Sequence, residues 1–316
     1  MLIKNKTPYA MERSIIFDKN GNETLLVILK GTYDFWQGGS ALTEEQAPIN
    51  AADEYFADPS TSSIKIATDF LPTRPSTGIT LCGHAVATNG QVETQQVGVR
   101  VGAVQQLALV LGDRFGYQNV DKPEPFEKIP LTWENAFGGF DQSHSNEKYH
   151  DAIASNPVGK GFIAARSQLD LNKIPLPNIE HLNKRIRAPR DAISPIGFGP
   201  ISPVWEPRRL YAGTYDDEWE KEKCPLLPDD FDDRFLQVAP QQLTSAKYLT
   251  EKEHCVLLGV TEEGRLDFDL DFEVPKISVE LVGRIKSSVP ALESIHFNSD
   301  EKKCYLTWKS MINIQG

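Results

Sequence analysis

Histidines and carboxylates gather in one short stretch, Asp141–Asp151, and side chains of these types could hold a metal ion. On a helix, His144 and Glu147 would share a face at i and i+3, with Asp151 at i+7. Imidazole and carboxylate groups arranged in this way are typical zinc ligands. The segment Gln142–Lys148 is polar and follows two glycines, however, which is more typical of a solvated loop. We therefore expect neither a metal site nor a bound cofactor.

Paired carboxylates offer a second chemistry, the hydrolysis of a glycosidic bond, which needs one acid on each side of that bond. The chain contains the pairs Asp229-Asp230 and Asp232-Asp233. Adjacent aspartates on a surface are more often solvated, or cap a helix. A hydrolase, possibly glycan-directed, is therefore kept as an alternative. Its acids would come from Asp141, Glu147, Asp229 and Asp232.

Other signatures of catalysis are missing from the sequence. Gly159-Lys-Gly161 lacks the upstream glycine and the following Ser or Thr of a phosphate-binding loop, and Gly197-Phe-Gly199 lacks the third glycine of a dinucleotide fingerprint. Neither a G-x-S-x-G elbow nor an H-E-x-x-H motif occurs. His84 lies in an apolar strand-like run, and we interpret it as a core histidine. We expect a protein without catalytic residues.

Aromatic and arginine residues are instead concentrated in Val204–Trp219. Trp, Tyr and Arg dominate the binding energy of protein interfaces, so this segment is a candidate for partner binding. The alternative is that its tryptophans pack a proline-rich layer. If the segment is an interface, replacing Arg208 and Arg209 together should weaken binding and leave the fold intact. The interface candidates are Trp133, Phe137, Phe140, Trp205, Arg208, Arg209, Tyr215 and Trp219.

Glycine and proline dominate the segments that must position these side chains. The blocks Pro130–Asp141, Asn156–Phe162 and Pro195–Trp205 combine both residues with large rings. Glycine reaches positive φ and proline fixes φ near −65°, so long helices and central strands are excluded there. We expect irregular backbone pinned by buried aromatic side chains. Within this region, Glu218–Lys223 is predicted to be a short helix that ends before Pro225.

Strand-like runs flank the irregular region on both sides. Thr88–Gln91 contains an Asn-Gly pair that favours a hairpin turn, and Leu42–Ala57 has a capping-box-like start that favours a short helix. We expect a mainly β fold, either β-sandwich-like or a two-lobed β scaffold. An irregular Pro/Gly/aromatic-rich middle layer and a few short helices would complete it. The predicted strands are Thr24–Phe35, Ile64–Phe70, Ile79–Ala87, Val92–Val101, Val104–Leu111, Cys255–Val260, Arg265–Phe272, Ile277–Gly283 and Cys304–Ile314.

Composition limits the classes of partner. The chain has 316 residues and a net charge of −11, which disfavours nucleic acid because phosphate binding needs clustered Lys and Arg. Met1–Thr7 has no apolar stretch of signal-peptide length, and the aliphatic runs are too short to span a membrane. We expect a cytoplasmic protein with no membrane or nucleic-acid partner. Cys82 and Cys255 lie in apolar runs and are interpreted as buried, reduced thiols.

Taken in order, the sequence blocks resemble a bacterial family, domain of unknown function 2169. The resemblance covers nearly the whole chain, and the ordered series is more specific than any one block. It implies one family-length domain over residues 1–316, in which 1–120 and 241–316 would be strand-rich sub-lobes and 121–240 the loop-rich middle. The blocks are Lys30–Asp34, Asp69–Ser76, Gly83–Ala85, Gly112–Arg114, Pro130–Asp141, Asn156–Gly161, Pro177–Glu180, Pro195–Pro200, Trp205–Arg208, Gly213–Asp216, Leu227–Asp232 and Leu306–Trp308.

The resemblance also implies a role beside type VI secretion systems. Members of the family look like non-enzymatic adaptors or chaperones that bind a toxic effector and help to load it onto the secretion spike. The expected partners are the cognate effector and a spike protein, either of the PAAR type or with valine–glycine repeats. The family is not defined by catalytic residues, so no site is carried over. A structural component that is exported with the spike remains a further alternative.

Overall fold

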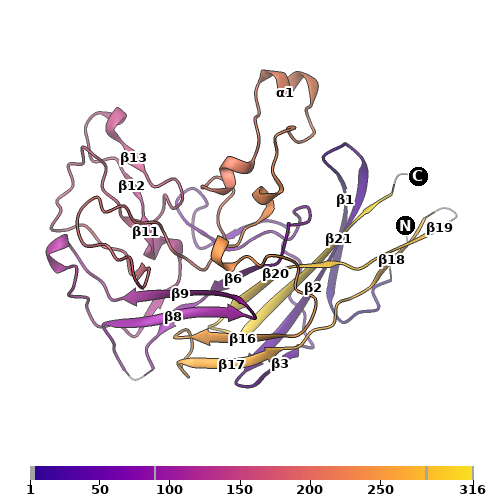
Figure 1. Cartoon of the computed structure of the whole chain (residues 1–316), viewed down its shortest axis with the longest axis horizontal. Coiled ribbons are helices and arrows are strands. Elements are labelled where there is room, and N and C mark those ends of the chain that lie inside the picture. The colour runs from indigo at the N-terminus through magenta and orange to yellow at the C-terminus, as the bar shows by residue number, and fades with distance from the viewer. Residues whose placement is uncertain (1–3, 89, 282–283, 315–316) are drawn as a thin grey trace.

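The computed structural model describes residues 4–88, 90–281 and 284–314, and it confirms a mainly β fold with short helices. Figure 1 shows two large twisted sheets, with the loop-rich middle of the chain gathered beside them. The six-stranded sheet has the order β1 (Ala10–Phe17), β2 (Glu23–Trp36), β21 (Lys303–Asn313), β20 (Ala291–Asn298) and β6 (Gly78–Cys82), with β3 (Gly39–Leu42) also paired to β2. The five-stranded sheet has the order β15 (Ile179–Glu180), β9 (Val104–Leu111), β8 (Thr94–Val101), β16 (Glu253–Leu258) and β17 (Arg265–Leu270).

Smaller elements complete the described part of the chain. The predicted helix near Glu218 is confirmed as α1 (Asp217–Glu222), with Asp216 as its N-cap. The short strand pairs are β4 (Glu54–Tyr55) with β5 (Ile64–Ile66), β7 (His84–Val86) with β10 (Lys128–Pro130), β11 (Phe137–Gly138) with β14 (Lys160–Gly161), β12 (Phe140–Asp141) with β13 (Asp151–Ala152), and β18 (Ile277–Leu281) with β19 (Arg284–Ser288). Single 3-10 turns span Tyr117–Asn119, Trp133–Asn135, Glu147–Tyr149, Arg208–Tyr211, Asp233–Leu236 and Gln241–Leu243.

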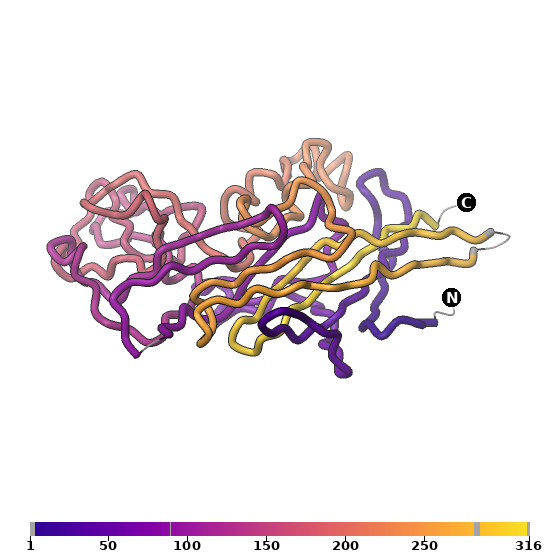
Figure 2. Tube along the Cα trace, turned by 60° about the horizontal axis from the view of Figure 1, so that its bottom comes forward, coloured from indigo at the N-terminus to yellow at the C-terminus, as the bar shows by residue number. Residues whose placement is uncertain are grey.

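Both large sheets combine strands from the two ends of the chain. In the first, β2 pairs antiparallel with β21 from Thr24 opposite Asn313 to Asp34 opposite Lys303. The parallel pairing of β20 with β6 joins the two ends again. In the second, β16 lies between β8 and β17. Figure 2 shows the early and late strands running side by side. The strand-rich parts 1–120 and 241–316 therefore share their sheets.

The two sheets enclose the main apolar core. Phe35 of β2 stacks on Phe268 of β17, with ring centroids 4.8 Å apart, and Phe297 of β20 meets Phe35 edge-on at 6.0 Å. All three side chains are at most 2% exposed. Burying large aromatic side chains is a principal source of folding free energy, so this contact between sheets positions everything built on them.

Several local predictions were wrong. Leu42–Ala57 forms no helix, because the Gln46 side chain instead ties the loop to β2, accepting a hydrogen bond from Thr32 N at 2.8 Å. The run Ile79–Ala87 is broken at Gly83, whose φ of +135° ends β6 before β7 begins. The predicted strand Ile64–Phe70 is regular only over β5. The sequence reading also missed β1, β19 and β20.

Two further expectations concern a turn and the thiols. The predicted hairpin turn Thr88–Gln91 includes Asn89, which lies outside the described residues; the strand before it, β7, pairs with β10. Cys82 and Cys255 are buried and form no disulfide, as predicted. Within the described ranges, no helix is long and apolar enough to cross a membrane.

Candidate functional site

Two buried tryptophans hold the irregular region together. Trp133 and Trp205 meet edge to face, with ring centroids 6.2 Å apart. Trp133 Nε1 also donates hydrogen bonds to the carbonyl oxygens of Gly199 and Pro200, at 3.2 and 3.1 Å. These contacts join the block that begins at Pro130 to the block that ends at Trp205. The prediction of irregular backbone pinned by buried rings is thus confirmed.

Arg208 is part of the same internal frame. Its side chain donates from Nη1 to the Ile201 carbonyl at 2.6 Å and from Nε to the Phe235 carbonyl at 2.8 Å. Burial, and secondarily the positive charge of Arg74, lowers the pKa of Arg208 to about 10. Buried carbonyls need such partners, because an unpaired polar group inside a protein is costly. Arg208 therefore connects segments that are distant in the sequence.

Half of the predicted interface residues consequently lie inside the protein. Trp133, Phe137, Trp205 and Arg208 are each 4–5% exposed. Their rings and charge are used in packing and in hydrogen bonds to the backbone, which leaves them no surface to offer a partner. Composition alone could not distinguish the anchoring side chains of this segment from the outward-facing ones.

The other four candidates are accessible. Phe140 is 55% exposed and Tyr215 is 53% exposed, while the Arg209 side chain reaches solvent and pairs with Glu206 at 3.1 Å. Trp219 is half-buried, and its ring lies 4.7 Å from that of Tyr215. Tyr215 and Trp219 thus form an aromatic pair at the start of α1, on the arm that projects from the body of the protein in Figure 1.

Sequence reasoning missed two aliphatic residues of the same segment. Val204 is 69% exposed and Leu210 is 65% exposed. Val204 precedes the buried Trp205, and Leu210 belongs to the 3-10 turn that begins at the buried Arg208. We call Val204, Leu210 and Tyr215 the exposed apolar set. Their signal in the sequence was weak, since an isolated Val or Leu in a loop does not indicate which way it faces.

A groove of about 560 Å³ lies beside this segment. Its walls come from the block around Gly197, the turn that contains Arg208 and Tyr211, and the stretch from Arg234 to Thr244. Trp133 forms part of its base. The groove is therefore formed by the irregular region, and the large sheets contribute only Gln106 of β9. Gln106 donates to the Gly197 carbonyl at 2.7 Å and so ties the groove to the sheet.

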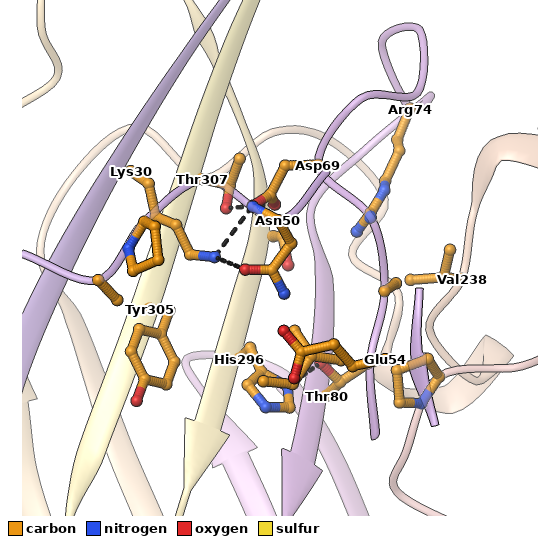
Figure 3. A pocket seen from close by; sticks show the side chains of 16 residues that line it. Lys30, Asn50, Glu54, Asp69, Arg74, Thr80, Val238, His296, Tyr305 and Thr307 are labelled. Atoms are coloured by element: carbon orange, nitrogen blue, oxygen red, sulfur yellow. Dashed lines mark hydrogen bonds and ion pairs between the residues drawn. The ribbon is translucent and has the colours of Figure 1, made fainter. Parts of the chain in front are cut away.

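A second hollow, a polar cavity of about 170 Å³, adjoins the groove behind Pro200 and Val238. Figure 3 shows the side chains of Lys30, Asn50 and Asp69 meeting there. Lys30 Nζ lies 2.9 Å from Asp69 Oδ2 and 2.8 Å from Asn50 Oδ1. Lys30 belongs to β2 of the six-stranded sheet, whereas Asn50 and Asp69 lie in loops. The sequence reading assigned no role to these residues. A lysine inside the apolar run of β2 was the available signal.

His296 lies in the wall of this polar cavity in its neutral form. Burial lowers its pKa to about 3, with the positive charge of Lys30 acting in the same direction and Asp69 opposing it. Its Nδ1 is 2.8 Å from Thr80 Oγ1, and its Nε2 is 3.4 Å from Cys82 Sγ. A histidine without charge in this place is a hydrogen-bonding group and not a cation.

The side chains of the stretch Asp141–Asp151 do not converge on a common site, and Asp141 and His150 make local hydrogen bonds instead. Among the described residues, no three His, Cys, Asp or Glu side chains come together as metal ligands would. Asp141 is buried; burial opposes its ionisation, but hydrogen bonds from Ser143, Ser167 and Ala164 outweigh that effect and lower its pKa to about 2. His150 Nε2 contacts the His144 carbonyl oxygen at 2.8 Å, and Glu147 is exposed.

The remaining acidic candidates and His84 are also engaged locally. Asp229 pairs with Lys223 at 2.5 Å, and Asp232 caps its turn through Arg234 N at 2.9 Å. The interpretation of His84 as a core residue was wrong, because its side chain is 36% exposed and its Nδ1 lies 2.9 Å from Asp300. The break at Gly83 turns His84 out of the apolar run.

Comparison with known protein families identifies the family of this chain. A family model described as "Uncharacterized protein conserved in bacteria (DUF2169)" matches residues 20–309, and the protein belongs to this family. The match begins after β1, before β2, and ends within β21, so it includes the irregular region, the five-stranded sheet and the six-stranded sheet except for β1 and the end of β21. Neither the curated proteins nor the solved structures contain a match.

Proposed function

We propose that the protein is a non-enzymatic adaptor or chaperone of a type VI secretion system. It binds a toxic effector in the cytoplasm and helps to load it onto the spike, through a PAAR-type tip or a valine–glycine-repeat protein. The match to the family model establishes the family of the protein and says nothing about its role. The rest is inferred from the irregular region and from the family resemblance of the ordered blocks.

One observation carries the proposal: two members of the exposed apolar set, Val204 and Leu210, lie on a hydrogen-bonded and packed internal frame. Val204 and Leu210 face solvent next to Trp205 and Arg208, which are buried and hydrogen-bonded or stacked in place. Large exposed apolar side chains are common at surfaces that bind other proteins. A frame that already fixes their positions lowers the entropy lost on binding, which favours association.

The test is co-expression with the proteins encoded beside this chain. We expect a tagged protein to retain the neighbouring effector, the neighbouring spike protein, or both, in near-stoichiometric amount. Val204→Asp with Leu210→Asp should weaken that association by about 1 kcal/mol or more per contact residue. Ile285→Asp is the matched control, because Ile285 is 71% exposed on the distant β18–β19 hairpin.

Three results would count against the adaptor role. The first is that the wild-type protein retains neither the effector nor the spike protein. The second is that the Ile285 control loses as much binding as the double variant. The third is the recovery of this chain in secreted material together with the spike, which would favour an exported structural component.

A further inference from the structure

The polar cavity contains one buried cation more than its ion pairs account for. Lys30 pairs with Asp69 at 2.9 Å, and Lys309 pairs with Glu293 at 3.1 Å behind it. Arg74, which also lines the cavity, is 3% exposed. Within residues 4–88, 90–281 and 284–314, no carboxylate lies at ion-pair distance from its guanidinium. A buried charge is normally paired, because desolvation without compensation is costly.

The acids nearest to Arg74 are already engaged. Glu293 accepts a hydrogen bond from the backbone N of Arg74 at 2.9 Å, and its charge is matched by Lys309. Asp69 accepts from Lys30, from the backbone N of Asn50 at 2.9 Å and from Thr307 Oγ1 at 3.2 Å. Its hydrogen-bonding capacity is largely used. Glu293, Asp69 and Asp53 lie near enough to favour the charged form of Arg74, but none of these carboxylates is at ion-pair distance from its guanidinium.

Hydrogen-bond donors without an acceptor also lie around this cavity. Arg74 Nε and Nη1 and Asn50 Nδ2 are buried and make no hydrogen bond to any described residue. Figure 3 shows the Arg74 and Asn50 side chains reaching towards one another across the cavity. Buried side-chain donors are usually satisfied, so three such donors around one hollow indicate an acceptor that belongs there.

A second buried guanidinium adds to the positive charge on this side. Arg208 lines the adjoining groove, and its hydrogen bonds go to neutral carbonyl groups. No ion pair of Arg208 is found in the described part of the chain. The positive charge of Arg74 contributes to the lowered pKa of Arg208, so the two guanidinium groups lie near enough to repel one another. Two buried guanidinium groups without an ion pair to any described residue thus line these two hollows, within a protein whose net charge is −11.

We propose that the polar cavity binds a carboxylate that bears a short hydrocarbon tail. The carboxylate accepts hydrogen bonds from Arg74 and from Asn50 Nδ2, and the tail packs against Ala47, Pro48 and Ile66 in the wall. A volume of about 170 Å³ suits such a ligand, since a cavity of about 150 Å³ holds benzene. The carboxylates of Asp69 and Glu54 in the wall disfavour a dianion such as phosphate.

Such a carboxylate could come from two sources. One is a free short-chain acid; the other is a bound polypeptide, which offers a glutamate side chain or its C-terminal carboxylate. The site is independent of the adaptor role, because it needs no effector or spike protein. Calorimetric titration of the purified full chain distinguishes the sources with two matched pairs of probes. The first pair is butyrate against butyramide, and the second is acetyl-dialanine with a free carboxylate against its C-terminal amide.

We expect one of the two carboxylates to bind and its neutral amide not to bind. Arg74→Gln should weaken that binding about tenfold or more, since a charge-assisted hydrogen bond is lost. Ala67→Leu should weaken binding as well, because the larger side chain reduces the volume of the cavity and leaves its polar groups in place. This variant tests the proposal if Arg74→Gln does not fold. Arg265→Gln is the control, because Arg265 is exposed and pairs with Asp267 at 2.7 Å.

The outcomes separate clearly. Tighter binding of butyrate assigns the site to a free acid, and tighter binding of the peptide assigns it to a polypeptide carboxylate. The proposal is overturned if neither carboxylate binds, or if amides and acids bind equally. It is also overturned if the wild-type protein and both cavity variants show the same affinity.

Discussion

At the scale of single residues, neighbours in the sequence have opposite environments. Arg208 is 4% exposed and donates to two buried carbonyls, whereas the Arg209 side chain is 59% exposed and pairs with Glu206. The double replacement expected to spare the fold therefore combines two unrelated effects. Separated, the two arginines distinguish a packing residue from a surface residue.

We predict that Arg208→Ala lowers the free energy of unfolding by about 2–4 kcal/mol, because two buried acceptors lose a charged donor. Arg209→Ala should change it by less than about 0.5 kcal/mol, as is usual for an exposed side chain. Urea denaturation of both variants measures the difference. Equal destabilisation by the two replacements would show that the buried hydrogen bonds of Arg208 contribute nothing particular. If the expected difference is found, Arg209→Ala is the variant to use in tests of partner binding, because it leaves the fold intact.

His296 should make the stability of the fold depend on pH. The unfolded chain takes up the proton near pH 6.5, whereas burial lowers the pKa of His296 in the folded state to about 3. The unfolded state thus binds more protons between these values, so the stability present above pH 6.5 is lost as the pH falls towards 3. We predict a loss of about 2 kcal/mol between pH 7 and pH 5 from this residue.

Denaturation of the wild-type protein and of His296→Gln at both pH values isolates the effect. The variant should lose about 2 kcal/mol less than the wild-type protein on acidification, whatever its own stability. His254→Gln serves as the control, since the His254 side chain is 49% exposed beside Asp269. An identical pH response of the wild-type protein and the His296 variant would mean that His296 takes up its proton in the folded state.

Residue types alone could predict only part of the candidate site. Arg and Trp in Val204–Trp219 indicated either a partner-binding segment or the packing of a proline-rich layer, and composition could not decide between them. Whether each side chain faced in or out depended on contacts with Phe235 and Trp133, which lie far away in the sequence. The polar cavity was missed for the same reason, because Lys30, Asp69 and Arg74 meet only after the chain has folded.

At the scale of elements, the irregular region is specified by close packing between backbone and rings. A Cβ added to Gly197 would lie 2.9 Å from three atoms of the Trp133 indole, whereas the nearest atom to one added to Gly199 is 3.6 Å away. The two glycines belong to one block and differ mainly in this contact. They provide a matched test of whether the block is tightly packed.

We predict that Gly197→Ala destabilises the protein by about 1–3 kcal/mol, because the Trp133 ring must move within a packed interior. Gly199→Ala should cost less than about 1 kcal/mol, since its methyl group meets only ordinary contacts. Chemical denaturation followed by tryptophan fluorescence reports both the stability and the environment of the ring. If both alanine variants behave alike, the block is loose, and the packed frame on which Val204 and Leu210 lie loses its support.

Strands could be predicted where the apolar periodicity was strong, and they were missed where an edge strand had mixed polarity. β2, β8 and β9 were found from their β-branched and aliphatic residues, as periodicity allows. β1 was missed because it is an edge strand with mixed polarity, Ile15 and Phe17 being about 60% exposed. The false helix at Leu42–Ala57 shows that a capping pattern can equally serve a loop, here through Gln46 and Thr32.

At the scale of the whole molecule, the chain closes its sheets with its own two ends. β21 pairs with β2 along nearly its whole length, and β20 is the sheet neighbour of β6. A protein built in this way cannot form its six-stranded sheet until its last strands are present. The irregular region, by contrast, is inserted between early and late strands, and its arm around α1 extends away from them (Figure 1).

We predict that a fragment ending at residue 290 does not fold, because β2 and β6 lose β21 and β20 and expose side chains such as Leu25 and Ile79. The matched control replaces residues 215–229 with a short Gly-Ser linker and should keep cooperative unfolding. The ends of that arm are already held together, since Thr214 N and Oγ1 donate to Asp230 at 2.9 and 2.7 Å.

Circular dichroism and urea denaturation of both proteins provide the measurement. If the fragment ending at residue 290 unfolds cooperatively, the early strands form a unit without the late ones, and the shared sheets are a weak association of two lobes. If the arm deletion unfolds instead, α1 and its flanking loops belong to the folding unit. We expect the fragment ending at residue 290 to lose cooperative unfolding and the arm deletion to keep it. The arm with Tyr215 and Trp219 would then be a recognition element whose removal affects binding and not folding.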